Sequence, residues 1–184
     1  TLEYCIREDL DRLAPRAMAV MEPLKLVLEN YPEDSEEHVE GSFWPGGSER
    51  SGSRRLPFGR ELYIERSDFM ERPTAGFRRL TPGGEVRLRF AYIVKCTGVI
   101  KDSRGQVVAL RGIYDPDSRS GTAGSKRKVK GTVHWLSVKY ARPAELRIYD
   151  QLFTVEVPDA AEDFLSVINP NSLRVVEALV EPAL

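Results

Sequence analysis

Short strand-like runs separated by turn residues recur along most of this chain, and they limit what it can fold into. The runs alternate apolar and polar residues over short stretches. Pro-Gly-Gly, Asp-Ser-Arg-Gly and Arg-Pro lie between them as turn signals. This pattern is typical of a β-barrel or a β-sandwich. Strands are expected at residues 60–66, 85–100, 107–115, 128–138, 144–154 and 172–180.

Two helices are expected outside this series of strands. The first lies near the N-terminus, where apolar residues stand at helical spacing until a proline ends the pattern, at Ile6, Leu10, Leu13 and Pro15. The second is expected late in the chain, with Asp159 as its N-cap and residues 164–168 as its apolar face. Residues 24–31 alternate as a strand does, and residues 32–55 indicate a loop or an irregular hairpin.

The charges of the chain are unevenly distributed, although they nearly cancel in total. Residues 1–49 carry 4 basic and 12 acidic side chains, and residues 150–184 carry 1 basic and 7 acidic side chains. Residues 50–149 carry 22 basic and 9 acidic side chains, which gives this block a net charge of +13. The block indicates either an anionic partner or a solvated charged surface. Arginine accounts for 20 of the 27 basic residues, which favours forked recognition of phosphates and base edges.

The segment FRRLTPGGEVRLRFAY, residues 77–92, concentrates four of these arginines around one turn. Arg87 and Arg89 share one face of the expected strand, while its apolar residues point to the core. We expect Glu85 to neutralise Arg87, which leaves Arg89 available together with Arg78 and Arg79 across the turn. Single-stranded RNA offers both phosphates and unstacked base edges to such side chains.

A second basic segment, GSKRKVKG at residues 124–131, contains Lys126, Arg127, Lys128 and Lys130. It is either a solvated loop or a contact surface for the phosphate backbone, which gives affinity without sequence information.

Other chemistry has little support in the sequence. His38 and His134 lack the partners of a nucleophilic site, so both are interpreted as structural or surface groups. Cys5 and Cys96 lie far apart and are expected to be core residues of a reduced, intracellular protein. No metal site is expected, because residues 115–121 lack the ligand spacing of a calcium loop and favour a capped turn. No secretory signal or membrane-spanning run is recognised.

Several long segments resemble, in order, the C-terminal anticodon-binding region of glutaminyl-tRNA synthetases, which are class I enzymes. The segments are CIREDLDRLAPRAMAVMEPLKLVLENY, LPFGRELYIERSDF, RRLTPGGEVRLRFAYIVKC, DPDSRSGT, KVKGTVHWLSVKYARPAELRIYDQLFT and DFLSVINPNSL. The resemblance implies a mainly β fold of two antiparallel β-barrels, proximal and distal, with a short N-terminal helix and one late helix.

The resemblance also implies an order of domains along the chain. Residues 1–14 would be a linker helix from the catalytic part, and residues 15–75 the first part of the proximal barrel. Residues 76–150 would form the distal barrel and crossover strands, and residues 151–184 a truncated return segment toward the proximal barrel.

By the same resemblance, each anticodon base enters its own pocket. Arg16 would contact the middle base, Arg79 the third base, and Arg87 and Arg89 the first base and its phosphate, with Arg78 at the adjacent basic position. Lys126, Arg127, Lys128 and Lys130 would contact the tRNA backbone. No catalytic residue is expected.

Three departures from the family pattern accompany the resemblance. Gly76 replaces a glutamine found in some members, and residues 43–45 read Phe-Trp-Pro where Asn-His-Pro is frequent. Members also continue with strands that bring an Asn-Arg pair to the middle base.

The implied function is anticodon recognition of glutamine tRNA within an ATP- and Mg-dependent ligase. That parent enzyme is expected to be cytoplasmic and monomeric, with no membrane partner, and the catalytic core of the same polypeptide is the second expected partner. No cofactor is expected on this chain itself. Alternatives are the equivalent region of an archaeal or eukaryotic glutamyl-tRNA synthetase and a stand-alone structural RNA-binding β-barrel. The basic block disfavours a carbohydrate-binding or protein-interaction sandwich.

Overall fold

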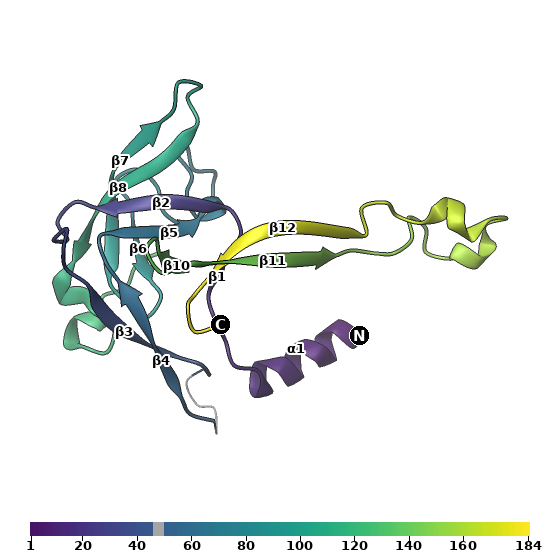
Figure 1. The fold of residues 1–184 in the computed structure, drawn as a ribbon, viewed down its shortest axis with the longest axis horizontal. Helices are drawn as coiled ribbons and strands as arrows, with labels where there is room; N and C mark the ends of the chain where they lie inside the picture. The colour runs from purple at the N-terminus through teal and green to yellow at the C-terminus, as the bar shows by residue number, and fades with distance from the viewer. Residues whose placement is uncertain (46–49) are drawn as a thin grey trace.

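The computed structural model describes residues 1–45 and 50–184 as a mainly β fold with one N-terminal α-helix (Figure 1). Residues 46–49, inside the loop or hairpin expected at 32–55, lie outside the described residues. The helix is α1 (Leu2–Leu13). The strands are β1 (Ala19–Val20), β2 (Pro23–Leu28), β3 (Glu37–Ser42), β4 (Ser53–Phe58), β5 (Glu61–Glu65), β6 (Glu85–Leu88), β7 (Ile93–Lys101), β8 (Val107–Asp115), β9 (Thr132–Val133), β10 (Trp135–Ser137), β11 (Arg142–Tyr149) and β12 (Leu173–Val180).

Five short 3-10 helices complete the description. They are η1 (Arg66–Asp68), η2 (Pro116–Ser118), η3 (Ala123–Lys126), η4 (Pro158–Ala160) and η5 (Phe164–Val167).

Seven strands form one strongly curved sheet in the order β10-β5-β2-β8-β7-β6-β9. The β2–β8 and β6–β9 pairs are parallel, and the other neighbours are antiparallel. The two edge strands, β9 and β10, are separated in the chain by His134 alone. The sheet therefore curls round until its edges meet at this residue, and it forms a nearly closed barrel.

The barrel interior is apolar and rich in aromatic rings. Alternate residues of β2 are fully buried, as their sequence pattern predicts. Phe58 packs edge-on against Trp135 with ring centroids 5.2 Å apart, and it contacts Tyr92 at 5.2 Å. Cys96 lies in this core as expected, whereas the prediction for Cys5 is wrong, because Cys5 is exposed on α1.

Strands β11 and β12 form a long two-stranded arm that projects from the barrel (Figure 1). Short β1 pairs with the base of β12 and so ties the arm to the start of the chain. The tip of the arm holds η4 and η5. The late helix predicted there is replaced by these two short turns, and the N-cap is Asp163, whose side chain accepts from Leu165 N at 2.9 Å, instead of Asp159.

Most strand predictions are confirmed, and the segment expected as a loop or irregular hairpin at 32–55 contains β3 and the start of β4, which pair antiparallel. The expected single strand at 85–100 is broken, because β6 ends at Leu88 and Phe90 adopts a positive φ of 65° before β7 begins. The curved sheet also takes strands from both sides of the domain boundary expected at residues 75/76, so the division into domains stays a prediction.

Candidate nucleic-acid interface

Arg16 and Arg89, far apart in the sequence, line one cavity of about 450 Å³. We name it the Arg16 pocket, and it is lined by Pro15, Arg16, Ala17, Met18, Arg54, Arg89, Phe90 and His134. The fold brings the two predicted side chains together because residues 15–18, which follow α1, and residues 89–90, which follow β6, line the same cavity.

Arg16 is held by its backbone and only loosely by its side chain. Its amide donates to the carbonyl of Phe43 at 2.7 Å, just after α1 ends. Its guanidinium pairs with Asp11 at 2.7 Å, and both side chains are solvent-exposed. Exposed pairs of this kind contribute little free energy, so a phosphate or base edge can replace Asp11 at low cost.

Arg89 has the most available guanidinium of the pocket. Its backbone is fixed, since its amide donates to Val133 at 3.0 Å and its carbonyl accepts from the Trp135 indole at 2.8 Å. Its guanidinium lies 5.0 Å from the centre of the Phe90 ring. Within the described residues the guanidinium has no hydrogen bond or ion pair. A fixed backbone with a free fork suits ligand binding.

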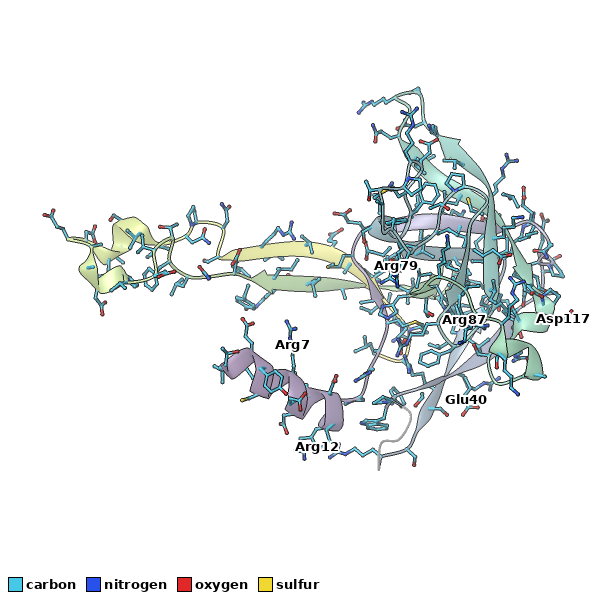
Figure 2. All side chains as sticks on the ribbon, turned by 180° about the vertical axis from the view of Figure 1, so that it is seen from behind. Arg7, Arg12, Glu40, Arg79, Arg87 and Asp117 are labelled. Carbon is cyan, nitrogen blue, oxygen red and sulfur yellow. The ribbon has the colours of Figure 1, made fainter. Side chains whose placement is uncertain are left out.

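Arg87 is occupied within the protein, by groups other than the one predicted. Its guanidinium donates to the carbonyls of Ser118, Ser125 and Arg127 at 2.8, 3.1 and 3.3 Å. The predicted Glu85–Arg87 pair is wrong, because Glu85 pairs with Arg127 at 2.7 Å. Burial, and then the charge of Arg127, lower the pKa of Arg87. Figure 2 shows Arg87 on the side of the barrel that carries Asp117, farther from the arm than Arg79.

A smaller cavity of about 230 Å³ contains Arg79 and Lys130. We name it the Arg79 pocket, and it is lined by Pro73, Phe77, Arg79, Thr81, Gly84, Glu85, Val129 and Lys130. Arg79 pairs with half-buried Asp68 at 3.0 Å. Burial raises the pKa of Asp68, although Arg79 acts in the opposite direction. The pair orients the arginine fork at the pocket.

Gly131 fixes the approach of Arg78 and Arg79 to β9. A Cβ at position 131 would lie 2.1 Å from the Arg78 carbonyl oxygen, a distance that no real side chain could adopt. Arg78 itself is exposed. The chain therefore needs glycine here so that the two arginines can lie against the strand.

The second basic segment, residues 124–131, begins within η3 and contains both ion-paired cations and cations unpaired within the described chain. Arg127 pairs with Glu85 at 2.7 Å and with Asp115 at 3.4 Å, and so holds the segment against the barrel. Lys126, Lys128 and Lys130 are exposed, and the described part of the chain supplies no ion pair to them. The predicted capped turn is confirmed, since Asp115 accepts from the amide of Asp117.

His134 belongs to the Arg16 pocket, a position that the sequence did not predict. The imidazole lines the Arg16 pocket. Partial burial, and then the charge of Arg89, lower its pKa, with Arg79 adding to the effect and Asp68 and Glu181 opposing it. Nothing in the sequence marked this position, because the pattern predicted one continuous strand at 128–138, whereas His134 separates β9 from β10.

Two departures noted in the sequence also lie near this interface. Phe43 stacks on the guanidinium of Arg54 at 4.9 Å and packs edge-on against Trp44. Gly76 is exposed with a φ of 87° and has open space around it.

Two further observations on the described residues concern metal-binding clusters and membrane-spanning helices. They contain no cluster of three or more His, Cys, Asp or Glu side chains that could hold a metal ion. None of the helices among them is long and apolar enough to cross a membrane.

Comparisons with known proteins agree along almost the whole chain. Residues 14–115 match the family model described as the anti-codon binding domain of class I tRNA synthetases (E and Q), and residues 132–184 match a second model with the same description. The chain is 55% identical over 175 residues to a glutamine–tRNA ligase of Bradyrhizobium diazoefficiens, which covers 95% of the chain and 31% of that protein.

Two more relatives give the same result. Identity is 53% over 183 residues to a glutamine–tRNA ligase of Nitrobacter hamburgensis, covering 100% of the chain and 32% of that protein. It is 52% over 185 residues to one of Xylella fastidiosa, covering 99% and 32%. The chain thus spans about a third of the length of these curated relatives.

Proposed function

Because the chain belongs to the family of anticodon-binding domains of the class I tRNA synthetases for glutamate and glutamine, we propose that it binds the anticodon of glutamine tRNA. The Arg16 pocket is the observation that carries this proposal. Two arginines from distant segments converge there on a cavity, and among the described residues the one carboxylate bound to either is the exposed Asp11. Such forks recognise phosphates and the edges of unstacked bases.

Each part of the interface has a separate proposed role. Arg16 contacts the middle base, Arg89 contacts the first base or its phosphate, and Arg79 contacts the third base in its own pocket. Arg87 holds the loop beside them through its three carbonyl contacts. The exposed lysines and Arg78 bind the RNA backbone, which positions the anticodon without selecting its sequence.

The parent protein is proposed to be a cytoplasmic, monomeric glutamine–tRNA ligase that joins glutamine to tRNA with ATP and Mg²⁺. This chain contributes selection of the tRNA, since both family models that match it describe anticodon-binding domains. A glutamate-specific enzyme is less favoured, because the curated relatives described above are all glutamine–tRNA ligases.

Binding of anticodon stem-loops by the full-length protein tests the proposal. Dissociation constants are measured for the glutamine tRNA stem-loop and for three variants, each with one anticodon base replaced. We expect each replacement to weaken binding by about 1–3 kcal/mol, as the loss of a forked arginine–base contact does. Equal affinity for all four RNAs would overturn the proposal.

A matched pair of variants divides the interface further. Arg79→Ala should weaken binding of the cognate stem-loop and reduce discrimination at the third base alone. Replacing Lys126 and Lys128 with alanine should weaken the binding of all four RNAs by the same factor. The proposed contact of Arg79 with the third base is wrong if Arg79→Ala weakens the binding of all four RNAs equally.

A further inference from the structure

We propose that the buried Arg54–Glu181 ion pair is a positioning element that sets Arg16 and Arg89 at their working separation. This inference rests on the proposed function and deepens it. Neither residue belongs to the sets expected from the sequence to contact RNA. Both are almost completely buried, with side chains 5% and 1% exposed.

Arg54 joins three segments of the chain at one point. Its Nε and Nη2 atoms donate to the two carboxylate oxygens of Glu181, and the Nη2–Oε2 distance is 2.8 Å. Its Nη1 atom donates to the carbonyls of Gly41 and Ser42 at 3.2 and 2.8 Å. The planar fork thus fixes the end of β3 relative to the residue that follows β12.

Two of these segments hold the backbone around Arg16. The second carboxylate oxygen of Glu181 also accepts from the amide of Met18 at 2.9 Å. Phe43, next in the chain after Ser42, accepts from the amide of Arg16 at 2.7 Å. The segment 16–18 is therefore held at both ends by groups that Arg54 binds directly or through one residue.

Arg54 is also connected to Arg89, through the ring of Phe90. The guanidinium carbon of Arg54 lies 5.6 Å from the centre of that ring, and the guanidinium carbon of Arg89 lies 5.0 Å from it. Phe90 is thus shared by both arginines, at the turn where φ is positive. A displacement of Arg54 would change the position of Phe90 and, with it, of Arg89.

A purely stabilising role would not require this arrangement. Buried ion pairs often stabilise a fold no more than apolar side chains of similar volume do, because desolvation offsets the attraction between the charges. Their geometry, however, is strict. Here the geometry coincides with the wall of the Arg16 pocket, which Arg54 itself lines.

Arg54→Lys in the full-length protein is the main test. Lysine keeps the buried positive charge, but it has no planar fork with which to bind the carboxylate and two carbonyls together. The readouts are the thermal midpoint and the affinities for the cognate stem-loop and its three single-base variants. We expect discrimination at the first and middle bases to fall at least about fivefold, and discrimination at the third base to stay unchanged.

Arg60→Lys is the matched control. Arg60 is partly buried, and like Arg54 it binds one carboxylate, Glu33 at 3.2 Å, and a backbone carbonyl, that of Tyr31 at 3.3 Å. It does not line either arginine pocket. We expect this variant to keep the discrimination of the unaltered protein at all three bases.

Glu181→Gln provides a second variant if Arg54→Lys does not fold. It keeps the shape of the side chain, removes the charge, and should reduce discrimination at the same two bases. Equal losses at all three bases, or a lower thermal midpoint with unchanged discrimination, would reduce the pair to a structural element and overturn the inference. If the unaltered protein fails to discriminate at any base, the proposed function itself fails.

Discussion

Arg87 and Arg89 carry the same functional group two positions apart, and their surroundings give them different uses. Three carbonyls of the neighbouring loop occupy Arg87, whereas the fork of Arg89 lies against an aromatic ring and faces a cavity. The difference arises because the chain leaves the strand after Leu88 and turns at Phe90. Regular alternation would have placed both side chains on one face.

Lysine substitutions should separate these two uses. Arg87→Lys should lower the free energy of unfolding by about 1–3 kcal/mol, because charged hydrogen bonds to carbonyls are lost. Arg89→Lys should leave thermal stability nearly unchanged and reduce discrimination at the first anticodon base. Thermal unfolding and stem-loop affinities measure both effects. If Arg89→Lys lowers stability and Arg87→Lys reduces discrimination instead, then Arg89 stabilises the loop and Arg87 binds the RNA.

His134 should make RNA binding depend on pH. In the free protein its pKa lies below the ordinary value of about 6.5, so the imidazole is neutral at pH 7. A phosphate placed beside it would raise that pKa, so that binding takes up a proton and affinity increases as the pH falls below 7. Affinities measured from pH 5.5 to 8 should show this increase, and His134→Gln should abolish it. An unchanged pH profile in the variant would show that no phosphate lies near the imidazole.

The same shift has an opposite effect on folding. Because the folded pKa lies below the unfolded one, the folded state binds this proton less tightly. Stability is therefore complete above the unfolded value and is lost as the pH falls through it toward the folded pKa. His134→Gln should reduce the loss of thermal stability over that interval.

At the scale of elements, the strands were predictable and their interruptions were not. Alternation located β2, β5 and β8 almost residue by residue, because each has one face on the core. It located β12 equally well, although most of that strand lies in the exposed arm. The turn at Phe90 carries no glycine or asparagine, so nothing in the sequence marks it. The late helix failed because its apolar residues, such as Phe164 and Leu165, have no core to pack on and remain exposed at the tip of the arm.

The candidate site was predictable as a set of arginines, but their grouping was not. Arg16, Arg79 and Arg89 follow from the family resemblance, whereas the shared cavity of Arg16 and Arg89 depends on pairing between segments far apart in the chain. The expected Glu85–Arg87 pair was wrong for the same reason, since Glu85 pairs with Arg127, which lies in a segment distant in the sequence.

Gly131 gives a prediction about β9 and the segment beside it. Gly131→Ala would force its methyl group into the Arg78 carbonyl, and we expect a loss of about 1–3 kcal/mol in stability from this overpacking. Discrimination at the third base should also fall, because Arg79 moves with Arg78. Gly59→Ala is the control, since its added Cβ would make only an ordinary contact of 3.8 Å. Similar behaviour of both variants would remove Gly131 from the site.

Viewed as a whole, the molecule has a basic block between two acidic ends. The cations that the described structure leaves exposed or loosely paired number about six in the proposed interface, and counterion release then governs the dependence of affinity on salt. They are Arg16, Arg78, Arg89, Lys126, Lys128 and Lys130.

Salt titrations check this count. Raising the salt concentration from 50 to 200 mM should weaken stem-loop binding by roughly 10³-fold if about six phosphate contacts form. Replacing Lys126 and Lys128 with alanine should reduce the slope of log affinity against log salt by about one for each lysine. An affinity that does not change with salt would contradict a charge-driven interface.

The meeting of the two sheet edges at His134 has a consequence for synthesis on the ribosome. The strands next to those edges, β5 and β6, emerge well before β9 and β10, which complete the sheet from both sides at once. A nascent chain that ends before residue 132 therefore carries an open sheet with two unpaired edges, and such edges invite pairing with other chains. The last stretch to close the barrel also holds the backbone of Arg89 and lines the Arg16 pocket. A stalled or shortened chain should therefore be both aggregation-prone and unable to bind RNA.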